Sequence, residues 1–386
     1  MFPQDPMAQS RSVGQSTSEK EDRRQPEKDD KIAGDKDDAR ERDSDAREEV
    51  VDQRSSHKLW LTVMDRIDPR TCLRGTSGTK MEPELVETVP VILQQIEDEL
   101  QRVEALKQLY RLTDRSHKHN RVPIVCTTKW NVLLSLIHCL RVDVLGASDD
   151  RRLACLALNN LSIPFENKAV MILGSEATNL LCALLSVIQS GHPESYLCCI
   201  CLMNLTFLED AVQPVLYFSP SSYNLRASGG PLDNPFSLLR TIETMLRMYS
   251  PFILSKVVSV EGEAVRWATG LIRNAVKKEK NASLIAKTEI PALVVGNIRN
   301  SPHPVGAWTR DSLEDLSLLV MCSMSRFSDS KKVLNAVGAC EAVERVIGLG
   351  GIHDFRATVI QSSLQEADDN SLRLLPTGDA HDSYHV

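Results

Sequence analysis

Apolar residues recur at helical spacing along most of the chain. Between Val89 and Leu112 they stand at Ile92, Ile96, Leu100, Val103, Leu106 and Leu109. Steps of three and four residues place side chains on one face of an α-helix. The alternation and the Asn-Gly turns that are typical of strands are missing. The pattern therefore predicts an all-α protein, with a buried helical stripe across residues 89–112.

The helical pattern also repeats along the chain. Apolar helices end in a recurring pair of residues: Arg111-Leu112, Asn160-Leu161, Asn204-Leu205, Asn274-Ala275 and Ser323-Met324. The steps between these closing pairs are 49, 44, 70 and 49 residues. Such lengths are typical of small groups of helices that stack on neighbouring copies of themselves. We therefore expect a solenoid of about five irregular repeats.

Each repeat carries similar signals for the ends of its helices. Residues that commonly cap helices stand six positions after the closing pair in three copies: Asn167, Asn281 and Ser330. We expect each side chain to accept hydrogen bonds from the first turn of a short helix. Helix-breaking residues then mark the joint to the next helix: Gly174, Pro291 and Gly338.

The composition divides the chain into four parts. Residues 1–56 are almost all charged or polar, which predicts a disordered tail, either a solubilising segment or an arm that binds a partner. Residues 57–83 are expected to form a short helix and a loop. Residues 84–365 form the predicted repeat domain, and residues 366–386 a flexible C-terminal tail.

The 70-residue step contains an insertion rich in Pro and Gly near residues 217–236. Loops of this length are often functional, and the aromatic residues Tyr217, Phe218 and Tyr223 make this one a candidate for contact with a partner. A plain spacer is the alternative. A smaller insertion lies between Arg299 and Ser312.

Two segments resemble the motif of armadillo repeats. They are Glu166-Asn167-Lys168 and Ala157-Leu158-Asn159-Asn160-Leu161-Ser162. The resemblance implies an armadillo-like α-solenoid, a right-handed superhelix whose third helices line a concave groove. In that family an Asn at the end of the third helix typically holds the backbone of an extended peptide.

The corresponding residues here are Asn160, Asn204 and Asn274. A carboxamide offers both a donor and an acceptor to a peptide unit, which suits this role. The alternative is that each Asn caps its own helix end. Armadillo proteins that import basic peptides place a Trp four residues before this Asn, but Trp267 lies seven before Asn274, so a nuclear-import adaptor is disfavoured.

Three basic residues share one face of the helix that carries Trp267. Arg266, Arg273 and Lys277 follow one another at steps of seven and four. If this face lines the groove, it favours an acidic or phosphorylated peptide. The alternative is an ordinary solvated basic face.

The sequence contains no recognisable catalytic or nucleotide-binding motif, so we expect neither an enzyme nor a cofactor. Cys198 and Cys201 have the spacing of half a zinc site, but no second pair lies nearby, and core packing is the expected role. The formal net charge of −7 argues against nucleic acid as a general partner. No run of eighteen apolar residues is present, so no membrane span is expected. Cysteines on apolar faces favour the reducing cytoplasm or nucleus.

These patterns predict a non-catalytic scaffold or adaptor that binds a peptide or a partner domain in the groove of the solenoid. The alternative is a regulator of another enzyme, similar to the armadillo-like nucleotide-exchange factors that clamp a chaperone or a G protein. The sequence does not define the oligomeric state.

Overall fold

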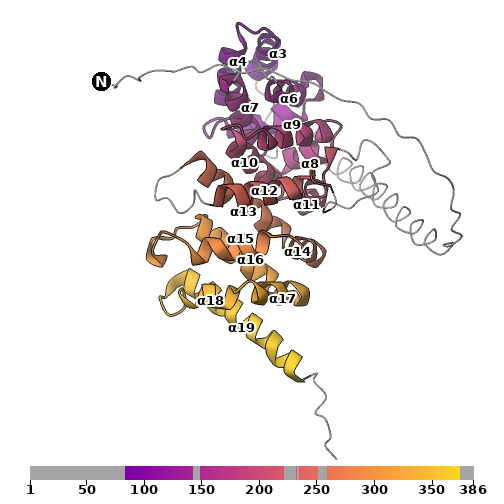
Figure 1. The fold of residues 1–386 in the computed structure, drawn as a ribbon. Coiled ribbons are helices and arrows are strands. Elements are labelled where there is room, and N and C mark those ends of the chain that lie inside the picture. Colours follow the sequence, from indigo (N-terminus) through magenta and orange to yellow (C-terminus); the bar gives the residue numbers. More distant parts are fainter. Residues whose placement is uncertain (1–82, 142–147, 221–231, 233, 251–258, 374–386) are drawn as a thin grey trace, which may run out of the picture. The chain divides into compact units, whose positions relative to one another are not determined.

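Every regular element in the described part of the chain is an α-helix or a 3-10 helix (Figure 1). The computed structural model describes residues 83–141, 148–220, 232, 234–250 and 259–373. The all-α prediction is therefore confirmed for these residues. The tail predicted for residues 1–56 lies outside them, and so does the helix and loop predicted for residues 57–83, apart from Pro83.

Helices three positions apart along the chain contact each other and form series. The first series comprises α3 (Pro83–Glu97), α6 (Val132–Arg141), α9 (Ala177–Gln189), α12 (Leu238–Tyr249), α15 (Ile290–Arg299) and α18 (Ala339–Glu344). The second comprises α4 (Arg102–Leu112), α7 (Ser148–Leu161), α10 (Ser195–Leu205), α13 (Val260–Ala275), α16 (Leu313–Met324) and α19 (Gly351–Arg373). Within each of these two series, every helix contacts the next member.

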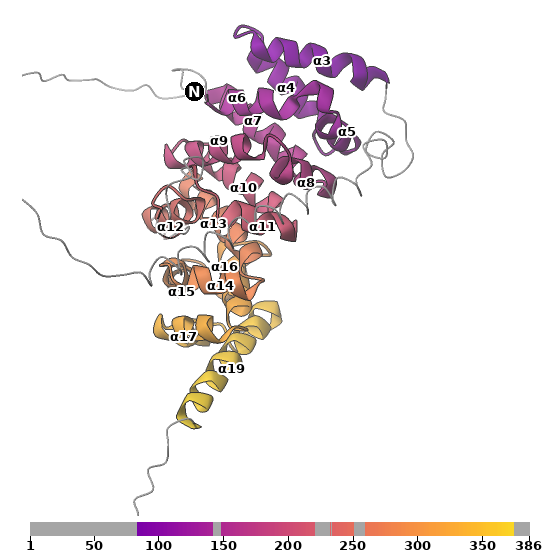
Figure 2. The same cartoon turned by 90° about the vertical axis from the view of Figure 1, so that its right-hand side faces the viewer.

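A third series consists of shorter helices (Figure 2). Its members are α5 (Arg121–Cys126), α8 (Phe165–Leu173), α11 (Glu209–Leu216), α14 (Glu279–Ala286) and α17 (Ser328–Ala336). Helix α8 contacts both α5 and α11, and α14 contacts α17. Short 3-10 helices lie in some of the described connections: η1 (Lys118–Asn120), η2 (Thr128–Trp130) and η5 (Val305–Ala307).

The closing pairs predicted from the sequence coincide with the ends of the second series. Helices α4, α7, α10, α13 and α16 end at the second member of each pair: Leu112, Leu161, Leu205, Ala275 and Met324. The predicted joints also agree with the structure. Gly174 directly follows α8, Pro291 is the second residue of α15, and Gly338 directly precedes α18. The sequence therefore predicted correctly where these five helices end.

The predicted stripe across residues 89–112 is broken at Leu100, which is 96 % exposed. The side-chain Oδ1 of Asp98 accepts a hydrogen bond from the Leu100 amide at 2.9 Å, an arrangement that competes with continued helix. The chain therefore leaves α3 after Glu97 and re-enters a helix at Arg102.

The predicted helix caps Asn167, Asn281 and Ser330 are wrong. Helices α8, α14 and α17 each begin two residues earlier, without a side-chain cap. Asn167 acts as a donor instead, because its Nδ2 lies 2.8 Å from the carbonyl oxygen of Leu161 and 2.9 Å from that of Arg121. It therefore ties α8 to two earlier helices. Serines cap three other helices, α12, α13 and α16: Ser237, Ser259 and Ser312.

The C-terminal helix α19 extends beyond the predicted end of the repeat domain. It continues past Gln365 to Arg373, into the segment predicted to be a flexible tail. Residues 366–373 lack Gly and Pro, so the chain has no strong signal to end the helix there.

Helix α13 packs closely against α10 through Gly270. A Cβ atom at this position would lie 2.6 Å from the sulfur of Met203. The missing side chain therefore allows the two helices to approach, because any larger residue would require Met203 to move.

Lys168 of α8 is a buried cation, with 5 % of its surface exposed. Its Nζ donates to the carbonyl oxygens of Ser162 at 2.5 Å and Ile163 at 2.8 Å. Burial lowers the pKa of Lys168 from 10.5 to about 8, and the nearby Cys201 and Glu166 only partly oppose this shift. Burial therefore makes the charged form costly in the folded protein.

We expect this lysine to make stability rise with pH in the alkaline range. Between pH 8 and 10.5 the unfolded chain binds more protons at this site than the folded chain, so the free energy of unfolding increases with pH. The measurement compares the unfolding midpoints of the wild type and Lys168→Met across this window. The difference, wild type minus variant, is expected to increase with pH, whereas a constant difference would contradict the lowered pKa.

Candidate partner-binding surface

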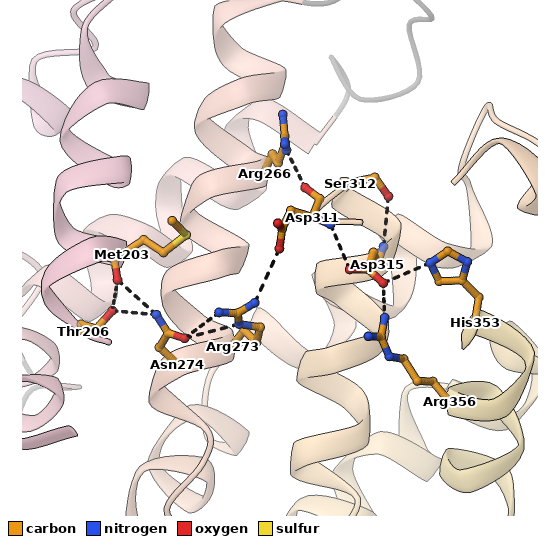
Figure 3. Close-up of polar contacts among 10 residues, drawn as sticks. All are labelled: Met203, Thr206, Arg266, Arg273, Asn274, Asp311, Ser312, Asp315, His353 and Arg356. Carbon is orange, nitrogen blue, oxygen red and sulfur yellow. Dashed lines mark hydrogen bonds and ion pairs between the residues drawn. The ribbon is translucent and has the colours of Figure 1, made fainter. Parts of the chain in front are cut away.

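The three asparagines predicted to bind a partner lie in the last turns of α7, α10 and α13, and each donates to an earlier helix. Asn160 Nδ2 lies 3.4 Å from Thr113 Oγ1. Asn204 Nδ2 lies 3.1 Å from Ser162 Oγ. Asn274 Nδ2 lies 3.2 Å from Thr206 Oγ1 and 3.1 Å from the Met203 carbonyl oxygen (Figure 3). Each asparagine therefore connects the end of its helix to the end of the previous member of the series.

These contacts differ from the capping role that was the alternative for the asparagines. In each case the amide nitrogen donates to the preceding helix instead of capping its own. Asn274 is buried, and its Oδ1 accepts from two guanidinium nitrogens of Arg273, at 3.3 and 3.1 Å. Asn160 and Asn204 are half-buried and retain exposed surface. Peptide binding by these two residues stays a prediction.

The predicted basic residue Arg266 is held by three groups. Its Nε donates to the carbonyl oxygen of Asp311 at 2.7 Å, and its Nη1 donates to both carboxylate oxygens of Glu263 at 3.2 and 3.3 Å. The guanidinium carbon lies 4.4 Å from the ring centroid of Trp267, whose Nε1 also donates to Glu263 at 2.9 Å. Arg266 and Trp267 therefore form one fixed unit with a neutralising carboxylate.

Arg273 and Lys277 lie close to the ring of Phe207, which stands two residues before α11 and is 49 % exposed. The Arg273 guanidinium carbon lies 5.3 Å from the ring centroid and Lys277 Nζ lies 6.0 Å from it. Cations within about 6 Å of an aromatic face are attracted to the ring. We call Arg266, Trp267, Arg273, Lys277 and Phe207 the cationic cluster.

The charges in the cationic cluster are only partly compensated. Burial lowers the pKa of Arg273, and Asp311 and Asp315 oppose this shift. Partial desolvation also lowers the pKa of Lys277; the positive charge of Arg273 adds to that effect, and Glu209 opposes it. Lys277 has no ion-pair partner among the described residues, so the cluster retains the capacity to bind an anion.

The loop residues predicted to contact a partner are only partly within the described chain. Tyr217 is half-buried against the core, and Lys280 Nζ lies 5.9 Å from its ring centroid. Phe218 also packs against the core, and its carbonyl oxygen accepts from the Leu238 amide at 2.9 Å. Tyr223 lies outside the described residues. Tyr217 and Phe218 therefore anchor the start of the insertion.

Sequence reasoning missed Phe207, Asp311 and Asp315. Phe207 directly follows the closing motif Asn204-Leu205-Thr206, so the sequence indicated that it lies in the connection to the next helix. Asp315 stands three residues after the cap Ser312, a spacing typical of a capped helix start. Asp311 offered no comparable signal, because its contact with Arg266 spans 45 residues of sequence.

The predicted core role of Cys198 and Cys201 is confirmed. Both thiols are buried, and Cys198 Sγ lies 3.8 Å from Cys155 Sγ. Burial raises the pKa of Cys201 to about 12, which keeps its thiol protonated at neutral pH. In the described part of the chain, no group of three or more His, Cys, Asp or Glu side chains is placed to hold a metal ion.

None of the described helices is by itself long and apolar enough to cross a membrane, although α8 and α9, which meet at a 90° bend, pass the length and composition test as a pair.

No protein-family model matches the sequence, and no curated protein matches it. Solved structures share the fold. Two engineered proteins from the Northeast Structural Genomics Consortium align with TM-scores of 0.52 and 0.51 at 12 % identity, over 72 % of this chain and 97 % and 98 % of theirs.

A third solved structure concerns a conserved phosphorylation switch that controls the interaction between cadherin and beta-catenin. It aligns with a TM-score of 0.56 at 13 % identity, over 74 % of this chain and 54 % of that one, so the present chain spans about half of its length. At 12–13 % sequence identity, the similarity to these structures shows that the chain has an all-helical fold.

Proposed function

We propose that this chain is a non-catalytic scaffold that binds a protein partner. Its repeated helices would form an armadillo-like solenoid, with the second helix series lining the binding groove. The partner supplies an extended segment that is acidic or phosphorylated. The observation that carries this proposal is the cationic cluster, in which Arg273 and Lys277 lie over the half-exposed ring of Phe207.

Three observations support a solenoid. Helices of three series recur in register, and the members of two of them contact one another without interruption. The asparagines link successive members of the second series. The fold also resembles a chain from a structure that concerns the interaction between cadherin and beta-catenin, a protein–protein complex.

The charge of the cationic cluster supports an anionic ligand. Glu263 neutralises Arg266, and Asp311 Oδ1 approaches Arg273 Nη1 only to 3.7 Å. Lys277 is exposed. A partner carboxylate or phosphate could accept hydrogen bonds from both Arg273 and Lys277, and hydrogen bonds to charged groups are the stronger ones. We also propose a cytoplasmic or nuclear location, because the core contains buried free thiols: Cys139, Cys155, Cys198, Cys199 and Cys201.

Reversing both charges, Arg273→Glu with Lys277→Glu, is expected to weaken binding of an acidic ligand at least about tenfold, because two charge-assisted contacts are lost. The measurement is fluorescence anisotropy with a labelled hexaglutamate peptide at several salt concentrations, and the salt dependence is expected to decrease.

The matched control is Lys331→Glu with Lys332→Glu on α17, which changes the net charge equally and is expected to leave affinity unchanged. Equal weakening by both double variants would reduce the effect to net charge and contradict the proposed site.

A further inference from the structure

Within the cationic cluster, Arg273 already faces a carboxylate of the chain itself, that of Asp311. This residue ends the smaller insertion, between η5 and α16. Its Oδ1 lies 3.7 Å from Arg273 Nη1 (Figure 3). The Asp311 side chain is 45 % exposed, whereas that of Arg273 is 18 % exposed. An accessible carboxylate therefore stands beside the less accessible guanidinium that an acidic partner would need.

The backbone of Asp311 is fixed in an unusual conformation. Its φ of 60° lies in the left-handed region, which only one other non-glycine among the described residues, Asn131, also adopts. Its amide donates to Asp315 Oδ2 at 3.0 Å, and its carbonyl oxygen accepts from Arg266 Nε at 2.7 Å. Uncommon backbone conformations persist where surrounding contacts hold them, and they are frequent at functional sites.

The backbone and the side chain of Asp311 are held to different degrees. The backbone is anchored to α13 through Arg266 and to α16 through Asp315. Among the described residues, the side chain has no such anchor beyond the 3.7 Å approach to Arg273. At this distance and exposure, an ion pair contributes little to stability, so another anion can replace it at low cost. The carboxylate can therefore leave Arg273 while the connection keeps its fold.

We propose that Asp311 is an internal competitor that sets the affinity and the specificity of the cationic cluster. Its carboxylate occupies the position of a partner's acidic group, and a ligand must displace it from Arg273 to bind. Ligands with the densest negative charge are therefore favoured, because they compete best for the guanidinium. This inference rests on the proposed function, since it requires an acidic ligand at the same cluster.

The test uses the full chain and the labelled hexaglutamate peptide. Asp311→Asn removes the charge but retains both backbone contacts, and Asn tolerates the left-handed conformation as well as Asp does. Asp311→Gly is a second variant in which positive φ carries no steric cost. Both are expected to bind the peptide about fivefold more tightly than the wild type, the change expected when a weak exposed ion pair no longer competes.

The matched control is Glu104→Gln, which removes one exposed carboxylate from α4 and is expected to leave affinity unchanged. Thermal melts test the alternative that Asp311 only stabilises the connection between η5 and α16. In that case the variants lower the melting temperature and do not bind the peptide more tightly.

If both Asp311 variants bind the peptide with unchanged affinity while Arg273→Gln still weakens binding, Asp311 is not an internal competitor. The proposed function is then still supported. Absence of peptide binding in the wild type and in all variants would overturn the acidic-ligand proposal and the competitor together.

Discussion

Replacing Asp315 by alanine is expected to lower the free energy of unfolding by about 3–5 kcal/mol, the usual cost of removing one partner from a buried charge pair. The loss is expected to concentrate at the C-terminal end of the described chain, because the partners of Asp315 lie on α19 and on the preceding connection. One carboxylate contacts both a histidine and an arginine of α19, so a single substitution removes both contacts.

Asp315 lies in the first turn of α16, and only 2 % of its side chain is exposed. Its Oδ1 contacts His353 Nε2 at 3.0 Å and also accepts from Arg356 Nη1 (Figure 3). Its Oδ2 accepts from the Asp311 amide at 3.0 Å. Alanine would leave the Arg356 guanidinium, whose side chain is 19 % exposed, without this carboxylate. An uncompensated charge in such a position is costly.

The measurement is urea unfolding together with hydrogen exchange of the backbone amides. Exchange is expected to accelerate in α19 and α16 and to stay unchanged in α7. Asp329→Ala on α17 is the matched control, because that carboxylate is 73 % exposed and, in the described part of the chain, pairs only with Lys332. Its effect is expected to stay within about 0.5 kcal/mol. A loss for Asp315→Ala as small as that of the control would contradict the role of the carboxylate in fixing α19.

The ends of the second helix series could be predicted because their signals are local. Each closing pair is followed within a few residues by a polar residue and a new helix, so the ends of these helices were predictable from the sequence. The break at Leu100 was not, because the apolar spacing continues through it. There the backbone is redirected by a side-chain contact of Asp98, which competes with the helix and which spacing alone does not reveal.

The candidate site was predictable only in part, for a related reason. The basic residues Arg266, Arg273 and Lys277 share one helix, so their common face followed from helical geometry. Their acidic neighbour Asp311 arrives from a connection after α15 whose path depends on tertiary structure. Contacts across 45 residues are not specified by spacing within one helix.

The asparagines show how a local motif can carry a long-range role. Asn160-Leu161-Ser162 and Asn204-Leu205-Thr206 each contain an amide donor and a hydroxyl. Asn204 donates to the hydroxyl of Ser162, and Asn274 donates to that of Thr206. Each motif therefore supplies the donor of the hydrogen bond to the previous helix of the second series and the acceptor of the hydrogen bond from the next one. The contacts between successive asparagines and hydroxyls could therefore be predicted by comparing the copies of the motif, but not from one copy alone.

Burial along this series indicates which asparagine matters most for stability. Asn160 is half-buried, and its side chain makes one hydrogen bond within the described residues, at 3.4 Å. Asn274 is 1 % exposed, and both ends of its amide are engaged. A buried polar group that loses its partner carries a full desolvation penalty, whereas an exposed one turns to water.

Asn274→Ala is therefore expected to lower the free energy of unfolding by about 2–4 kcal/mol, through lost hydrogen bonds and the cavity left beside α10. Asn160→Ala is the matched control, with an expected loss below about 1 kcal/mol. Urea unfolding of both variants provides the comparison. Equal losses would show that burial does not govern these joints. A large loss confined to Asn274→Ala would show that this variant damages the packing of α10 against α13 and removes the acceptor of Arg273. Reduced partner binding in this variant would then reflect that damage. Binding at the cationic cluster is therefore better tested by substituting Arg273 and Lys277.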